Sequence, residues 1–120
     1  MEIKTPTILG DLSFRLGGLR MPVTVYNSTP VAMADTIWGV FKTGINNTAQ
    51  AITLPDPAVA VGKLLIFKVS VSIGSGTVTL SQHGSETIDG ATTFAMDAQY
   101  EAVTIVSDGT NWHIVSKITV

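Results

Sequence analysis

The sequence predicts an all-β protein, an antiparallel β-sandwich similar to a jelly roll, built from about eight short strands. Two observations favour this fold class. Val, Ile and Thr, whose branched side chains suit a pleated strand, make up 40 of the 120 residues. Turn-forming clusters of Gly, Pro, Asn and Asp recur every ten or so residues between the apolar runs. No segment has the length of a credible helix, although 58–61 could hold one turn. The expected strands are Pro22–Asn27, Thr36–Thr43, Gln50–Leu54, Lys63–Val71, Thr77–Ser81, Thr92–Met96, Tyr100–Ser107 and Trp112–Thr119.

The strongest local signal is Asp108-Gly109, which stands between two alternating apolar runs and is typical of a tight hairpin. A two-residue loop would pair Ser107 with Thr110 and would set Ile105 opposite Trp112. A slip of one residue would place the apolar residues of the two strands on opposite faces, so the turn and the pattern agree. The residues expected in one buried layer are Val103, Ile105, Trp112 and Ile114.

Residues 1–21 differ from the β domain expected over 22–120. Their apolar residues follow neither the period of a strand nor that of a helix for long, so the segment has too little pattern to fold alone. A frayed terminus is one interpretation, and an extended arm that lies on a neighbouring subunit is the other. The number of large apolar residues favours the arm. The contact residues expected in it are Ile8, Leu9, Leu12, Phe14, Arg15, Leu16, Leu19 and Arg20.

Two of the expected strands are apolar on both faces. In 36–43, Trp38 and Val40 point away from Phe41, and in 63–71, Leu64 and Ile66 point away from the other apolar residues. A strand that is apolar on both faces is usually buried on both. We therefore expect Trp38 and Val40 to contact the arm or another subunit, although Trp38 could equally belong to the domain core.

Composition narrows the classes of partner. Charged residues make up only 13% of the chain, against about 25% in ordinary domains, which favours an oligomer or burial in an assembly. The chain has no cysteine and a net charge of −2, without a cluster of Lys or Arg. Disulfides and thiolate metal sites are excluded, and a nucleic-acid partner is not expected. We expect no membrane span, because no apolar run approaches the roughly 18 residues required, and the N-terminus does not have the pattern of a signal peptide.

The two histidines do not indicate a reaction. His83 stands in a glycine turn, and His113 is expected on the outward face of the last strand. His83, Glu86 and Asp89 are residue types that bind metals, but a polar turn between short strands explains them equally well. We expect no metal, no cofactor and no enzymatic activity.

Other motifs also have simpler explanations. Ser85 or Ser107 could join a catalytic triad only through distant partners, and the nucleophile motif G-x-S-x-G is absent. Gly74-Ser75-Gly76 follows a strand but opens no helix, so we interpret it as a hairpin turn and not as a phosphate loop. Trp112 could be a platform for a sugar ring, but its register predicts core.

The segment from Ile52 to Val115 carries a set of recurring short motifs, namely Leu54-Pro55, Gly62-Lys63, Gly76-Thr77-Val78-Thr79, Thr87-Ile88-Asp89-Gly90 and Ser107-Asp108-Gly109-Thr110-Asn111-Trp112. In these motifs it resembles a β domain of bacteriophage virion proteins. The resemblance implies a non-enzymatic structural protein of the tail fibre, head fibre or capsid surface, typically a homotrimer.

The absence of stalk-forming repeats from the sequence favours one of these roles. A whole tail fibre needs a stalk of heptads or β-helical repeats, and we find no such repeats in the sequence. We therefore expect a capsid decoration (cement) protein, a trimer on the outer surface of the phage head that binds the major capsid protein. The alternative is a fibre or receptor-binding tip that contacts the host surface or a glycan through loops such as 82–89.

Overall fold

The structure, a computed structural model, describes residues 20–120, and in this part of the chain it shows nine strands and one short 3-10 helix. The elements are β1 (Val23–Val25), β2 (Val31–Ala32), β3 (Gly39–Thr43), β4 (Gln50–Thr53), η2 (Pro57–Val59), β5 (Leu64–Val69), β6 (Val78–Ser81), β7 (Thr93–Met96), β8 (Ala102–Ser107) and β9 (Trp112–Ile118). The expected all-β class is confirmed. Within the described part, no helix has the length and apolar character needed to cross a bilayer.

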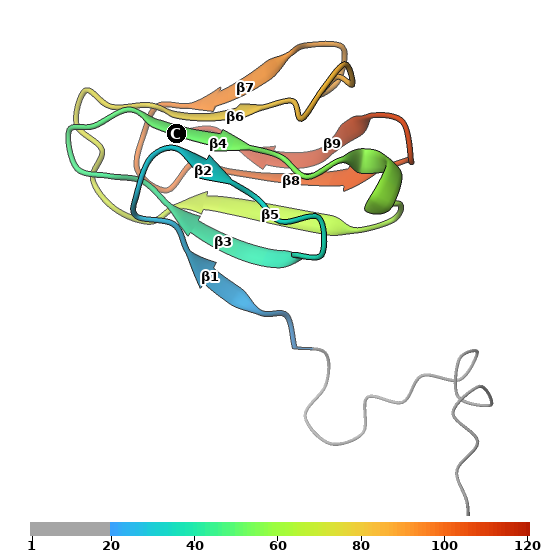
Figure 1. Cartoon of the computed structure of the whole chain (residues 1–120). Coiled ribbons are helices and arrows are strands. Elements are labelled where there is room, and N and C mark those ends of the chain that lie inside the picture. Colours follow the sequence, from blue (N-terminus) through green and yellow to red (C-terminus); the bar gives the residue numbers. More distant parts are fainter. Residues whose placement is uncertain (1–19) are drawn as a thin grey trace, which may run out of the picture.

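The strands form two mixed sheets, of order β1-β3-β5-β8-β9 and β2-β4-β6-β7. From β1 to β6 the chain alternates between the sheets, so that it winds like a flattened coil (Figure 1). The pairs β1–β3, β3–β5, β2–β4 and β4–β6 are consequently parallel. Only β5–β8, β6–β7 and β8–β9 are antiparallel. The prediction of an antiparallel, jelly-roll-like arrangement was therefore wrong.

The winding also corrects the interpretation of Gly74-Ser75-Gly76. This turn does not join a hairpin, because it carries the chain from β5 in one sheet to β6 in the other. The N–H of Gly76 donates to the carbonyl of Ile73, whose side chain is buried. A Cβ atom on Gly76 would lie 2.4 Å from the carbonyl oxygen of Thr48, so the close approach of two crossings requires glycine here.

Both sheets contribute to one hydrophobic core. The alternation along β3, β5 and β8 turns Phe41, Phe67 and Val103 inward, and β4 and β6 add Ile52 and Leu80. The rings of Phe41 and Phe67 stack with centroids 5.2 Å apart. The two sheets therefore share a single buried layer, in keeping with a sandwich-like arrangement.

The register of the C-terminal hairpin differs from the predicted one by two residues. Ser107 pairs with Trp112 and Ile105 with Ile114, so the loop comprises residues 108–111 and not Asp108-Gly109 alone. The Asp108 carboxylate accepts hydrogen bonds from the N–H groups of residues 110 and 111, and this Asx turn lengthens the loop. A shift of two preserves the faces of the strands. Of the residues expected in the core, Val103, Ile105 and Trp112 are buried, and Ile114 packs half-buried against them.

Trp112 provides a direct test of this core. Its side chain is completely buried, and its Nε1 has no hydrogen-bond partner in the described structure. We expect Trp112→Ala to lower the free energy of unfolding by about 3–5 kcal/mol, because the substitution leaves a large cavity. Trp112→Phe should cost much less, since it retains an aromatic ring and removes a buried unpaired donor. Chemical denaturation measures both losses, and a loss below about 1 kcal/mol for the alanine variant would contradict the burial of Trp112.

Candidate functional site

The first candidate site is the side of the five-stranded sheet that points away from the core. We call it the outer face. The strand registers align Val23, Val40, Ile66 and Thr104 in one row across β1, β3, β5 and β8. In a second row, Leu64 of β5 pairs with Val106 of β8. Trp38 directly precedes β3, and because Gly39 pairs with Leu65, Trp38 is level with Leu64 on the other side of β5. These residues alternate with the core residues of the same strands, so they point away from the core.

The outer face is apolar and accessible within the described structure. Trp38 is 40% exposed, Val23 is 61% exposed and Val25 is 58% exposed, while Val40 and Ile66 are half-buried. A contiguous apolar patch on a sheet usually marks a contact with another macromolecule. Trp38 and Val40 point away from the buried Phe41, as the alternation predicts, and Trp38 lies on the outer face and not in the core, a choice that the sequence left open. Their contact with a partner stays a prediction.

Charged groups stand at the two ends of this face. Lys42 and Lys68 are paired in register at one end, where the Lys68 Nζ donates to the carbonyl of Tyr100 at 2.9 Å and lies 5.6 Å from the centroid of its ring. At the other end His113 pairs with Val106, and its Nε2 lies 2.6 Å from the Asp108 carboxylate. The apolar centre thus has cations at one end and a carboxylate at the other.

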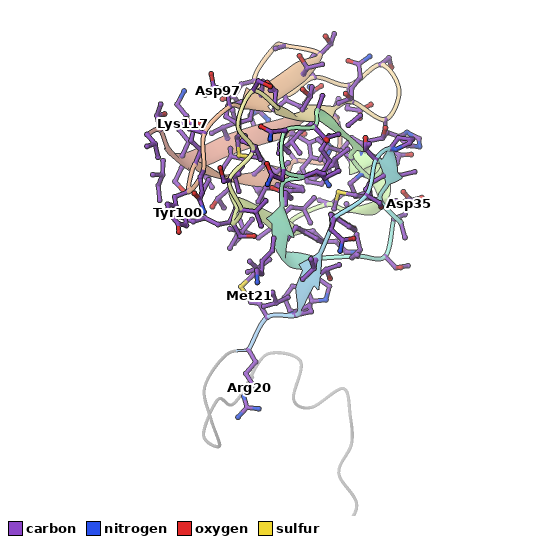
Figure 2. The ribbon with its side chains drawn as sticks, turned by 90° about the vertical axis from the view of Figure 1, so that its left-hand side faces the viewer. Arg20, Met21, Asp35, Asp97, Tyr100 and Lys117 are labelled. Atoms are coloured by element: carbon purple, nitrogen blue, oxygen red, sulfur yellow. The ribbon has the colours of Figure 1, made fainter. Side chains whose placement is uncertain are left out.

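The predicted contact residues of the N-terminal arm cannot be placed on this face. Ile8, Leu9, Leu12, Phe14, Arg15, Leu16 and Leu19 lie outside the described residues. Arg20 is exposed and, with Met21, lies at the foot of the domain next to β1, away from Lys117 of β9 (Figure 2). The chain therefore enters the β domain at the edge strand whose side chains Val23 and Val25 belong to the outer face.

The second candidate site is a shallow polar cavity of about 380 Å³ where η2, the 82–86 loop and the β8–β9 loop meet. Glu86 is buried, and its carboxylate accepts hydrogen bonds from the N–H groups of His83 and Gly84. The Asn111 Oδ1 accepts from the N–H of Thr87 at 2.8 Å. The carboxylate and the amide oxygen thereby fix the two loops, while the cavity offers polar groups to a ligand.

The structure divides the candidate chemical residues among separate contacts, and it places His113 between two carboxylates, with Nε2 2.6 Å from Asp108 Oδ2 and Nδ1 3.8 Å from Asp89 Oδ1. The oxygens of Glu86 bind the backbone of their own loop, and Asp89 accepts from the N–H of Ile114 at 3.1 Å. Within residues 20–120, no group of three His, Asp or Glu residues is placed to hold a metal ion. The buried Ser107 donates from its Oγ to the carbonyl of Pro57 at 2.7 Å, which is a structural bond between β8 and η2.

Two carboxylates have lowered pKa values for reasons of local backbone geometry. The N–H groups of Asn111 and Thr110 lower the pKa of Asp108 to about 2, with a smaller contribution from His113. Burial raises the pKa of Glu101, but hydrogen bonds from the N–H groups of Asp97, Val120 and Ala98 outweigh it, so the pKa is lowered. Both carboxylates accept hydrogen bonds from loop backbone.

Sequence reasoning missed Gln50, a buried polar residue whose side chain makes three hydrogen bonds. It is buried on the inward face of β4, at a position where the alternation predicts an apolar residue. Its Oε1 accepts from the N–H of Gly44, and its Nε2 donates to the carbonyls of Tyr26 and Ser28. The detectable signal was a single amide in an otherwise apolar inward row, which usually means that the backbone of neighbouring turns needs a partner.

Neither a scan against protein-family models nor a search of curated proteins found a match for this chain.

The Asp108 turn yields a prediction of pH dependence. Because the folded pKa lies below the ordinary value of 3.8, the turn favours the folded state above that value, and the contribution disappears as the pH falls toward about 2. We expect the Asp108 carboxyl to titrate near pH 2 when it is followed by NMR. In His113→Ala most of the depression should remain, since the backbone bonds are the larger cause. A return to the ordinary pKa in this variant would show that the histidine, and not the Asx turn, is responsible.

Proposed function

We propose that this chain is a non-enzymatic structural protein of a phage particle, a trimeric decoration (cement) protein that binds the outer surface of the head. The resemblance of residues 52–115 to virion β domains supports the class of particle. The observation that carries an assembly role is the outer face, where Trp38, Val40 and Ile66 form an apolar surface on one side of a folded domain.

The arrangement suits a protein that bridges subunits. A two-sheet domain has all the core it needs on its inward faces, so an apolar outer face adds nothing to the stability of an isolated copy. Desolvation of that face against a neighbour would stabilise the assembly, and the large aromatic side chain of Trp38 is typical of a contact that contributes strongly. The N-terminal segment, which joins the domain at β1, would act as the extended arm that contacts the shell or the adjacent copy.

A lysine in the middle of the outer face tests the proposal. We expect Ile66→Lys to convert the trimer into a monomer, because the charge would have to lose its water at the contact. Binding to capsids that lack the protein should weaken roughly 30-fold, the factor that corresponds to a contribution of about 2 kcal/mol from a strong contact residue. Light scattering measures the oligomer, and co-sedimentation with capsids measures binding.

Thr79→Lys is the matched control, because Thr79 is also half-buried on an inner strand, β6, but faces outward from the other sheet. It should leave the trimer and the binding unchanged, and circular dichroism should show that both variants fold. A monomeric unmodified protein, or a trimer that tolerates Ile66→Lys, would refute an assembly role for the outer face.

The polar cavity supports a second function, a fibre or receptor-binding tip. The cavity is lined by residues 83–86, part of the segment expected to touch a ligand, and its lining also includes Asp56 and Asn111. Polar, hydrogen-bonding loops of this kind suit a hydroxyl-rich ligand such as a glycan.

Filling the cavity distinguishes the two functions. If the protein is a receptor-binding tip, Ala58→Phe should abolish binding to host cells or to a glycan array, because Ala58 lines the cavity. Ala91→Phe is the control, since Ala91 is exposed but is not a lining residue. Binding that survives Ala58→Phe would exclude the cavity as the receptor site, and binding to empty capsids without any host binding would favour the decoration role.

A further inference from the structure

The charged residues of the β domain are divided between the two ends of its strands. The end that carries η2 (Figure 1), where β4 and β8 finish and β5 begins, holds five of the seven Asp and Glu residues of 20–120. In this acidic end they outnumber the two basic residues, Arg20 and Lys63, and they are Asp35, Asp56, Glu86, Asp89 and Asp108. The opposite lysine end, where β3 and β5 finish, holds Lys42, Lys68 and Lys117, together with Asp97 and the buried Glu101. The domain therefore has excess negative charge at one end and excess positive charge at the other.

Three carboxylates of the acidic end are accessible and fixed in place. Asp35 is exposed, and the side chains of Asp89 and Asp108 are about half exposed. The Oδ1 of each accepts a hydrogen bond from the backbone, as from the N–H of Asp56 to Asp35 and from the N–H of Ile114 to Asp89. Within residues 20–120, the second oxygen of Asp35 and of Asp89 makes no hydrogen bond, so each can accept one from a cation.

Lys42 and Lys68 stand side by side on the outer face at the lysine end. They pair in register on β3 and β5, and like charges on neighbouring strands repel each other. Lys42 is exposed, and Lys68 is held by Tyr100, whose carbonyl accepts from its Nζ at 2.9 Å. Within residues 20–120, neither lysine forms an ion pair with a carboxylate. An anionic partner would remove the repulsion between the two ammonium groups.

The two groups of charges cannot meet within one copy of the chain. The six residues of β5 separate the acidic end from the lysine end, which is a distance of about 20 Å at about 3.3 Å per residue. An ion pair requires the nitrogen and the oxygen to approach within about 4 Å. The lysines of one copy can therefore pair with these carboxylates only in a second copy, in a contact that joins two different surfaces.

The position of the lysines also determines the geometry of such a contact. Lys42 alternates with Val40 along β3, and Lys68 alternates with Ile66 along β5, so the lysines are continuous with the apolar centre of the outer face. The acidic end of a second copy would then meet a face and not the opposite tip. A contact between a face and an end turns each copy relative to the last, and such a rotation can close a ring.

We propose that the acidic end of one copy binds the outer face of the next copy in the trimer, with its exposed carboxylates around Lys42 and Lys68. The ion pairs fix the direction of the contact, because a reversed copy would place like charges together. The adjoining apolar centre of the outer face is desolvated by the same contact. This inference rests on the proposed trimer and names the two surfaces that form it.

A zero-length cross-linker tests the contact in the full-length protein. A carbodiimide activates a carboxylate, and a lysine amine in contact with it displaces the activating group as a urea and forms an amide. In trimers mixed from isotope-labelled and unlabelled chains, we expect amides that join Lys42 or Lys68 of one chain to Asp89 or Asp108 of another. Lys63 is the internal control, because its Nζ donates to the carbonyl of Asp35 in the same chain at 3.1 Å. A trimer that gives only links within one chain would overturn the proposal.

Charge reversal provides a second measurement. Lys42→Glu should raise the concentration at which half of the protein is trimeric by roughly tenfold or more, because a carboxylate would then face carboxylates. Lys117→Glu is the matched control, since Lys117 is exposed at the same end but pairs with the buried Val103 and lies outside the row of Lys42 and Lys68. It should leave the trimer unchanged.

Light scattering over a range of concentrations measures the trimer, and circular dichroism verifies that each variant folds. A trimer that tolerates Lys42→Glu but not Ile66→Lys would overturn this contact and leave the assembly role of the outer face intact. An unmodified protein that remains a monomer would overturn both.

Discussion

The fold depends on the hydrogen bonds made by Gln50. The side chain of this one residue of β4 joins two crossings of the coil, through the N–H of Gly44 after β3 and the carbonyls of Tyr26 and Ser28 after β1. Crossings that pass between two packed sheets bring backbone groups into a buried layer, where an unpaired group costs about 1–3 kcal/mol. A single amide, with donors and an acceptor on one flat group, satisfies three of them. The Gln50 amide therefore stabilises the parallel winding of β1 to β4 by pairing backbone groups of the turns after β1 and β3.

This dependence explains which parts of the fold the sequence could predict. The faces of the strands follow from the period of two, so the inward positions of Val103, Ile105 and Trp112 could be predicted from pattern alone. For Trp38 the pattern predicted a side opposite Phe41 but left core and interface equally open. The pairing of the strands could not, because alternation is identical in parallel and antiparallel sheets and the crossings have no distinctive motif. The two-residue β2 was missed for a related reason, since Pro30 and the polar residues before it resemble a turn.

The two candidate sites also differ in whether the sequence could predict them. The outer face could be predicted, because it consists of apolar residues at alternate positions of β3 and β5 and needs no knowledge of the topology. The polar cavity could not, because it unites η2, the 82–86 loop and the β8–β9 loop, which are distant in sequence. Its walls are held by Glu86 and Asn111, whose oxygens bind loop backbone. Residues that resembled a metal cluster in the sequence are thus the supports of a loop surface.

The two ends of the coil differ in a way that bears on assembly. At the end formed by β9, the register with β8 shifts between Thr104 and Ile105, and β9 carries His113 and Lys117. Irregular pairing and charge both discourage another strand from adding to that edge. At the opposite end, β1 and β2 carry no charge, and Val23 and Val25 are more than half exposed. Natural sheets rarely leave such an edge bare, so selection against uncontrolled association predicts a specific occupant at this end, and the chain enters the domain at this same edge.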